Sequence, residues 1–356
     1  MKKHGETVFF VLLFIAAAAF PQAAAQGAKE ALGICMNTVI PSVFPLMFAS
    51  MLLVRADRAN IFGRILEKPV KFLFGLPGCA GKALTAAVLG GYPAGAVAVK
   101  TLCKNGEISR KQAADISLIA VCAGPSFVIG AVGCGIYSST SAGVMLLCVQ
   151  MLSVLIIGII MRFFLGKQKT ETAGNSIVAP NDDIFVSSAL DSARSMMSVC
   201  TFVVLFGAIG GILSAVKLDH GVSCILKTIK VPDTLADSAV SMLLEVSSGC
   251  IQASKVSIEA VAFVLGFGGL SVHFQIFSIV KELGVNKALF VILRFMQGII
   301  CAVLAHFGAI LLPDDAVETA AVYAQRSMPS VTGCVCLVIM CFMLLFCAPT
   351  HLTKDN

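Results

Sequence analysis

The sequence predicts an all-α polytopic membrane protein, and three observations lead to this fold class. Hydrophobic residues make up 58% of the 356 residues and charged residues only 13%, whereas a typical soluble domain has roughly 25% charged residues. The mean hydropathy of the chain is +0.92. One helical crossing of a membrane needs about 20 residues, and uncharged stretches of about this length recur along the chain. Because so little charge cannot cover a water-soluble protein of this size, we expect a multi-pass membrane protein.

About seven to eight transmembrane helices are expected. In chain order, the full spans are Val8–Ala25, Ala31–Val54, Ala113–Ile136, Val144–Phe164, Ser195–Val216, Ala288–Leu312 and Val331–Thr350. The first is interpreted as an uncleaved signal anchor, although a basic start, an apolar run and small residues are also typical of a cleaved signal peptide. A turn over Tyr137–Gly143 separates the third and fourth spans. With the N-terminus inside, most Lys and Arg lie on the cytoplasmic side, as the positive-inside rule requires.

Two further apolar segments carry glycine at their centres. Ala83–Val99 contains Gly90 and Gly91, and Ala260–Val280 contains Gly268 and Gly269. Backbone that is broken at membrane depth is tolerated only where protein or a cavity satisfies its polar groups. We therefore interpret both segments as re-entrant hairpins and not as spans.

An internal repeat relates the two hairpins. When Gly90 and Gly91 are placed on Gly268 and Gly269, Gly106 also falls on Gly284. An odd number of passes in the first repeat predicts that the second is inverted, as in many secondary transporters. The alternative is that glycine-rich membrane helices look alike by chance. The expected units are an anchor over 1–26, repeat 1 over 27–166, a polar cytoplasmic linker over 167–188, and repeat 2 over 189–356.

Polar and glycine residues around these hairpins are the candidate substrate-binding residues. They are Gly91, Tyr92, Pro93, Gly95, Gly124, Pro125, Ser126, Glu245, Ser248, Gly268, Gly269, Ser271, His273 and Gln275. Ser271 and Gln275 are four residues apart and share a helix face, while His273 points elsewhere. The alternative is that these groups only satisfy the broken backbone. Gly124-Pro125 either lines the same cavity or only kinks its helix, and a kink is the preferred interpretation.

Glu245 is an acid in a largely apolar segment, which is by default a functional hypothesis. Its neighbours Ser247, Ser248 and Gly249 indicate a local break, where the carboxylate could bind a cation, a proton or a substrate hydroxyl. The alternative is a salt bridge with Arg294 or Lys255.

No enzyme motif is present in the sequence: GxSxG, HExxH, the P-loop and a carboxylate pair are all missing, so we expect no catalytic residues and no enzyme activity. Most of the 14 cysteines lie in apolar runs and none forms a CxxC pair, so we expect no metal and no cofactor. The expected partners are the lipid bilayer and an unknown small-molecule or ion substrate. Homo-oligomerisation is left open, and nucleic acid is not expected because the basic residues are scattered.

Five motifs in order carry a resemblance to a known family. "GGYPAGA", "NGEISRKQAADI", "AGPSFVIGAVG", "LLEVSSG" and "GFGGLSVHFQ" resemble the YlbJ-type sporulation integral membrane proteins, within the Gate or nucleoside-recognition group. The resemblance implies a multi-pass protein of the bacterial cell (inner) membrane, with a role in sporulation. It also implies transport of a small polar solute, nucleoside-like or ion-coupled. The departures are Val97, Val121 and Ser248, where the family usually has Lys, Asn and Asn. The alternative function is a non-transporting scaffold needed for spore cortex or coat assembly.

Overall fold

The computed structural model describes residues 2–56, 61–165 and 184–310, and this part of the chain is helical, without a strand. Its first half contains α1 (Lys2–Ala19), α2 (Pro21–Ile34), the π-helical turn η1 (Cys35–Val39), α3 (Ile40–Ala56), α4 (Ile61–Pro69), the π-helical turn η2 (Val70–Phe74), α5 (Ala80–Gly90), α6 (Tyr92–Lys104), α7 (Arg110–Ile119), the π-helix η3 (Ser126–Ile136) and α8 (Thr140–Leu165). The second half contains α9 (Ile184–Ala215), α10 (Leu218–Thr228), α11 (Asp233–Leu244), α12 (Val246–Ser254), α13 (Ile258–Phe267), α14 (Gly269–Ile279), the 3₁₀ turn η4 (Lys281–Leu283) and α15 (Lys287–Ala309).

Five helical segments of this described part are long and apolar enough to cross a membrane. They are Pro21–Ala49, Thr140–Phe164, Ile184–Ala215, Ile258–Ile279 and Lys287–Ala309. The protein is therefore a multi-pass helical membrane protein, as the composition predicts. The expected span Val331–Thr350 and residues 167–183 of the expected linker lie outside the described residues. The last five residues of the expected linker, 184–188, belong to α9 instead, which begins at Ile184.

The N-terminal spans differ from the prediction. A single helix over Val8–Ala25 is wrong, because α1 ends at Ala19 and Pro21 begins α2. Proline is favoured in the first turn of a helix because its missing N–H has no partner there in any case. The apolar helix that follows continues through η1 into α3, so it begins well before the expected start at Ala31.

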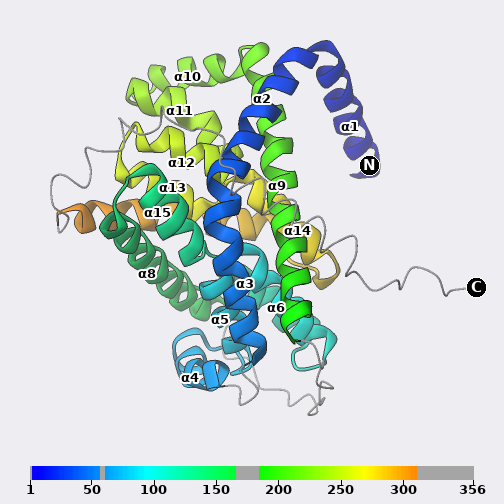
Figure 1. Ribbon diagram of the computed structural model, residues 1–356, viewed down its shortest axis with the longest axis vertical. Helices are drawn as coiled ribbons and strands as arrows, with labels where there is room; N and C mark the ends of the chain where they lie inside the picture. The colour runs from blue at the N-terminus through cyan, green and yellow to red at the C-terminus, as the bar shows by residue number, and fades with distance from the viewer. Residues whose placement is uncertain (1, 57–60, 166–183, 311–356) are drawn as a thin grey trace, which may run out of the picture.

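The helix pair α2 and α9 forms one side of the molecule, with the two helices running in opposite directions (Figure 1). Small residues line the contact: a Cβ atom on Gly207 would lie 2.8 Å from the carbonyl oxygen of Gly27. Such small residues let two membrane helices approach closely. Towards the centre of the molecule, α13 packs on α12 and α15, α14 packs on α6 and α9, and α8 packs on α15 and η3.

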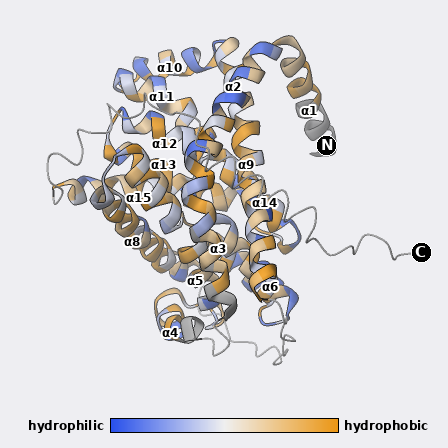
Figure 2. Cartoon of the chain, viewed as in Figure 1, coloured by the Kyte–Doolittle hydropathy of each residue, from blue (hydrophilic) through white to orange (hydrophobic). Residues whose placement is uncertain are grey.

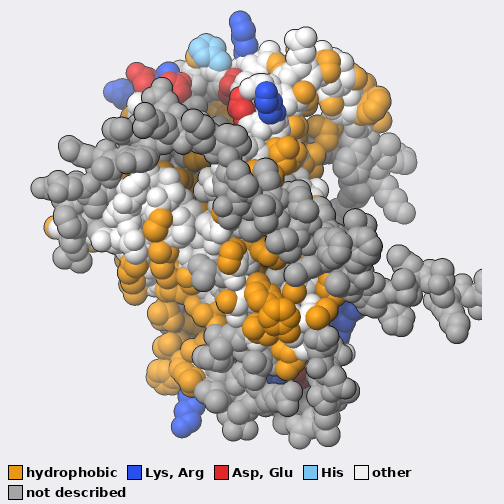
Figure 3. All heavy atoms as spheres, in the orientation of Figure 1, with side chains coloured by type: hydrophobic (Ala, Val, Ile, Leu, Met, Phe, Trp, Pro, Cys, Tyr) orange, Lys and Arg blue, Asp and Glu red, His pale blue; other side chains and the backbone are white. Residues whose placement is uncertain are grey.

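Apolar side chains cover the outer faces of these helices as well as the core. Phe163, Phe164 and Phe72 are exposed, and orange ribbon predominates on α8, α9 and α15 (Figure 2). Figure 3 shows hydrophobic side chains across the middle of one face, with charged side chains gathered at its upper end near α10 and α11. An apolar outer band with charge at the end is what a lipid environment requires.

Candidate functional site at four helix interruptions

The first interruption lies between α5 and α6, which pack on each other. Gly91 joins them with φ +80°, a conformation that glycine adopts without steric cost. A Cβ atom at Gly91 would lie 3.1 Å from the backbone nitrogen of Gly124. Gly124 belongs to a second interruption, because α7 ends at Ile119 and η3 begins only at Ser126. The preferred interpretation of a simple kink at Gly124-Pro125 is therefore wrong, since the backbone leaves the helix for several residues.

The third and fourth interruptions face each other in the second half. Gly268 and Gly269, with φ +84° and +68°, separate α13 from α14. Glu245 is extended, with φ −144° and ψ 135°, and separates α11 from α12. A Cβ atom at Gly269 would lie 3.1 Å from the Cα atom of Glu245. The sequence predicts the break near Ser247–Gly249, but it lies at Glu245 itself, and those residues are in α12.

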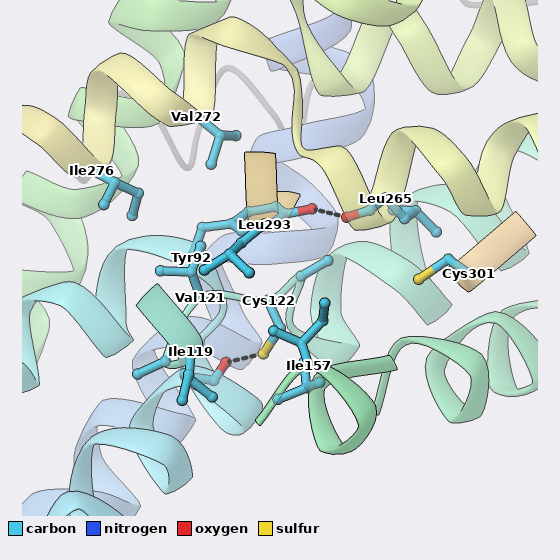
Figure 4. Packing of buried hydrophobic residues seen from close by; sticks show 14 of the residues in the cluster. Tyr92, Ile119, Val121, Cys122, Ile157, Leu265, Val272, Ile276, Leu293 and Cys301 are labelled. Atoms are coloured by element: carbon cyan, nitrogen blue, oxygen red, sulfur yellow. Dashed lines mark hydrogen bonds between the residues drawn. The ribbon is translucent and has the colours of Figure 1, made fainter. Parts of the chain in front are cut away.

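Tyr92 connects the two pairs of interruptions. Its hydroxyl donates to the carbonyl of Leu265, with a distance of 2.7 Å between the two oxygens, and Figure 4 shows this bond crossing from α6 to α13. The Tyr92 ring also lies 3.6 Å from the position of a Cβ atom on Gly268. The Leu265 carbonyl is in the last turn of α13, where carbonyls have no partner within the helix. Tyr92 thus satisfies a group that the interruption leaves free.

Glu245 is the buried acid of this site, with 2% of its surface exposed. Its Oε2 atom accepts a hydrogen bond of 2.7 Å from the backbone N–H of Ser248, so the side chain caps the N-terminus of α12. A carboxylate suits that position because the helix dipole is positive there. Among the described residues, the other oxygen, Oε1, is buried without a hydrogen-bond partner.

The α14 side chains Ser271, His273 and Gln275 are all buried, His273 with 1% and Gln275 with 3% of their surface exposed. His273 Nδ1 bonds to the Gly269 carbonyl, so this nitrogen carries the proton and Nε2 is an acceptor. Within the described part of the chain, His273 Nε2 and Gln275 Nε2 have no hydrogen-bond partner. The Phe267 and Phe290 rings lie 4.8 Å and 5.3 Å from the imidazole.

Arg294 does not pair with Glu245, contrary to the expected alternative. Its guanidinium donates to the Leu118 carbonyl at 2.9 Å and to the Val121 carbonyl. These carbonyls lie where α7 stops, so they need a partner from outside the helix, and a cation is favoured at a helix C-terminus. Lys255 is exposed and donates to the Gln252 side chain at 3.0 Å. No ion pair joins Glu245 to another described residue.

Buried polar side chains between α8 and α15, here called the polar seam, were not among the residues predicted from the sequence. Gln297 Nε2 donates to the Ser153 hydroxyl at 3.0 Å, and Gln150 Nε2 lies 3.4 Å from the Leu265 carbonyl. Isolated Gln and Ser residues within apolar spans were the signal that could have found it, because polar side chains at membrane depth are rare without a partner.

The remaining predicted residues shape the backbone. Pro93 is in the first turn of α6, and Pro125 directly precedes η3. At Gly95 a Cβ atom would lie 2.7 Å from the Cβ atom of Ala87, so this glycine allows α5 and α6 to pack. Ser126 is buried in the first turn of η3.

Comparison with known proteins supports the family resemblance. The sporulation integral membrane protein YlbJ of Bacillus subtilis (strain 168) is 27% identical over 325 residues, which are 83% of this chain and 80% of that protein. The chain is similar to YlbJ over most of the length of both proteins. No family model matches the chain, and no solved structure matches it. The resemblance to the YlbJ-type proteins and the membrane location are thereby confirmed, whereas membership of the Gate group stays a prediction.

The three departures from the YlbJ-type pattern lie at different places. Val121 and Ser248 contribute to the site through the backbone: the Val121 carbonyl binds Arg294, and the Ser248 N–H binds Glu245. Such backbone bonds do not depend on the side chain. Val97 lies on α6 and lines a cavity beside the first interruption.

Proposed function

We propose that this protein carries a small polar solute across the bacterial cell membrane during sporulation. The binding site of this proposal is the pair of interruptions at Glu245 and Gly268–Gly269. Relatedness to a sporulation membrane protein supports the cellular context. Transporters commonly build their binding sites from discontinuous helices that meet within the membrane, and this arrangement supports the mechanism.

The observation that carries the proposal is the set of buried polar atoms without partners. Glu245 Oε1, His273 Nε2 and Gln275 Nε2 come from residues beside one pair of interruptions. Leaving a buried donor or acceptor unsatisfied costs about 1–3 kcal/mol for each group. A chain that only needed these helices to pack would be more stable with apolar residues at these positions. A bound solute that supplies the missing hydrogen bonds offsets this cost.

The chemistry of these atoms indicates the class of solute. Glu245 Oε1 and His273 Nε2 accept hydrogen bonds, whereas Gln275 Nε2 donates one. The two terminal nitrogens of Arg294 donate to the Leu118 and Val121 carbonyls, and only its Nε is without a partner among the described residues. The positive end of α12 is occupied by Glu245. A neutral or cationic solute with hydroxyl or amine groups, such as a nucleoside-like compound, fits this set better than an anion does.

Solute accumulation in proteoliposomes tests the proposal. Vesicles with the wild-type chain and with Glu245→Gln are incubated with the small-molecule extract of sporulating cells, and their contents are compared by mass spectrometry. We expect at least one polar solute to be enriched in wild-type vesicles and not in Glu245→Gln vesicles. Equal contents in both, and in empty vesicles, would support the alternative, a scaffold for cortex or coat assembly.

A further inference from the structure

A cavity of about 460 Å³ lies beside the first interruption. Lys82, Ala86 and Gly90 line it at intervals of one helical turn, so it follows one face of α5. Over this distance α5 rises by about 12 Å. At Gly90 the cavity reaches the interruption, because the Gly90 carbonyl carbon lies 3.3 Å from the position of a Cβ atom on Gly124.

Ala94 and Ala98 continue the lining along α6. The opposite wall of the cavity comes from the other half of the chain, where Asp191 and Ser195 contribute from the N-terminal part of α9. The cavity therefore lies between the hairpin of α5 and α6 and a helix that packs on the α14 of the second unit.

The far end of the cavity is charged on both sides. Lys82 Nζ lies 2.7 Å from Glu107 Oε2, and an Arg194 nitrogen lies 3.3 Å from Asp191 Oδ1. Each cation is matched by a carboxylate, so the charges at this end compensate one another. A balanced pair of this kind attracts neither anions nor cations over a distance.

We propose that this cavity is a water-filled vestibule through which an uncharged or zwitterionic solute passes between the cytoplasm and the helix interruptions. The inference rests on the proposed function. The volume is in the range of about 300–1,000 Å³ that is usual for small-molecule sites. The side chains at the charged end are partly exposed, and the inner end is at the interruption that Tyr92 connects to the second unit. The cytoplasmic side is the one predicted from the Lys and Arg distribution.

Thiol labelling of α6 tests the vestibule. Ala94→Cys and Ala98→Cys place a thiol on the lining, whereas Ala96→Cys places it on the same helix at a fully buried position that does not line the cavity. The probe is a charged methanethiosulfonate reagent added to inside-out membrane vesicles, with labelling of the unsubstituted chain subtracted. We expect both lining positions to react at least about tenfold faster than Ala96→Cys, because thiol modification follows exposure.

Two outcomes would overturn the vestibule. One is equal rates at the three positions, and the other is reaction with a lipid-soluble maleimide alone, which would make the cavity a lipid-filled groove. Neither outcome affects the comparison of wild type with Glu245→Gln in proteoliposomes. The two proposals therefore fail separately.

The compensated charges are tested with a pair of reagents of opposite charge. With Ala98→Cys as the reporter, we expect anionic and cationic reagents to react at similar rates. Glu107→Gln leaves Lys82 without its carboxylate and should shift the ratio toward the anionic reagent by about three- to tenfold. Glu67→Gln, which removes an ion pair with Lys71 away from the cavity, is the control and should leave the ratio unchanged. If Glu107→Gln leaves the ratio of the two labelling rates unchanged, the paired charges at this end of the cavity do not determine which reagent enters.

Discussion

At Gly91 the interrupted backbone faces the backbone of Gly124, whereas at Gly269 it faces Glu245. Both glycines have a positive φ, and each unit has a second such glycine further along, Gly106 with +72° and Gly284 with +74°. The two units thus share a positive φ at two corresponding glycines, although Gly268 also has a positive φ and its counterpart Gly90 does not. Their chemistry is different.

In the first unit, two of the carbonyls at the end of α7 have a side-chain partner. Arg294 binds the carbonyls at the end of α7, and an open cavity lies alongside. In the second unit, the side chains of Glu245, His273 and Gln275 retain unpartnered buried atoms. We propose from this comparison that one unit supplies framework and access and that the other supplies recognition.

The largest effect is expected from alanine at the two interruption glycines. All four substitutions Gly91→Ala, Gly269→Ala, Gly106→Ala and Gly284→Ala place a side chain at positive φ, which costs roughly 1–2 kcal/mol. Only Gly91→Ala and Gly269→Ala also bring a Cβ atom to 3.1 Å from other backbone, while nothing lies within 4 Å at Gly106 and Gly284. We expect overpacking to cost these two about 1–3 kcal/mol more. Thermal unfolding in detergent measures the difference, and equal losses in all four would remove the distinction between interruption and turn.

Arg294→Gln should have the next largest effect, because it removes charge-assisted hydrogen bonds from the end of α7. The Gln amide can still donate to one carbonyl, so we expect a net loss of about 1.5–3 kcal/mol. The expected partner Glu245 is not involved, so Glu245→Gln should not rescue Arg294→Gln. We expect a coupling energy below about 0.5 kcal/mol in the double-mutant cycle. Lys287→Gln, which removes an exposed cation from the same helix, is the control. Restored stability in the double variant would return Arg294 to the role of counter-ion.

A smaller effect is expected in the polar seam between α8 and α15. Gln297→Leu removes the bond to Ser153, and such bonds between membrane helices average about 0.6 kcal/mol. Thermal unfolding of Gln297→Leu, Ser153→Ala and the double variant gives the coupling. A coupling energy of several kcal/mol between Gln297 and Ser153 would show that this seam has a functional role and does not only hold the helices together.

The smallest effect is expected at the exposed contact between α10 and α11, outside the segments that can span the membrane. Hydrogen bonds from the Ser223 hydroxyl and the Lys227 ammonium lower the pKa of the Asp237 carboxyl below its ordinary value of 3.8. The bond to Asp237 raises the pKa of Lys227 above its ordinary value of 10.5. A depressed carboxyl pKa stabilises the fold above the unfolded value, and this stabilisation is lost as pH falls through the folded value. The raised Lys227 pKa stabilises the fold below pH 10.5, and this stabilisation is lost as pH rises through the folded value.

Unfolding temperatures of the wild type and Asp237→Asn across this range measure the contribution of the contact. The two curves should differ slightly near neutral pH and converge below about pH 4. A difference that persists in acid would show that Asp237 acts through packing and not through its charge.

The glycine pairs at the centres of two apolar segments predict two of the four interruptions well, because glycine is unfavourable inside a helix unless the backbone must bend there. The interruption at Glu245 is predicted two to four residues too late. No glycine or proline marks the extended backbone at Glu245, and the prediction followed Ser248 and Gly249 instead. The partner of Arg294 could not be inferred. The carbonyls of Leu118 and Val121 become free only because α7 stops, and a carbonyl has no signature in the sequence. The single N-terminal helix is wrong because the chain breaks at Phe20, and Pro21, which begins α2, is the signal in the sequence that could have shown this.

Membrane topology of the two units stays a prediction. The repeat predicts that Lys104 and Lys281, which follow the two glycine segments, lie on opposite sides of the membrane. Cysteine replacement at each position, with labelling in intact cells by an impermeant reagent, measures this directly. Labelling of both positions from one face would exclude the inverted arrangement and leave a direct repeat.

The most direct measurement of the central claim is a comparison of stability with function in Glu245→Gln. The amide oxygen of Gln can still accept the Ser248 N–H, so the cap of α12 is retained while the charge is removed. We predict an unfolding temperature close to that of the wild type, together with loss of the ability to restore heat-resistant spores in a Bacillus subtilis strain that lacks YlbJ and that the wild-type chain complements. If Glu245→Gln restores spores as fully as the wild type does, the carboxylate is only a helix cap, and the second unit is not the recognition site.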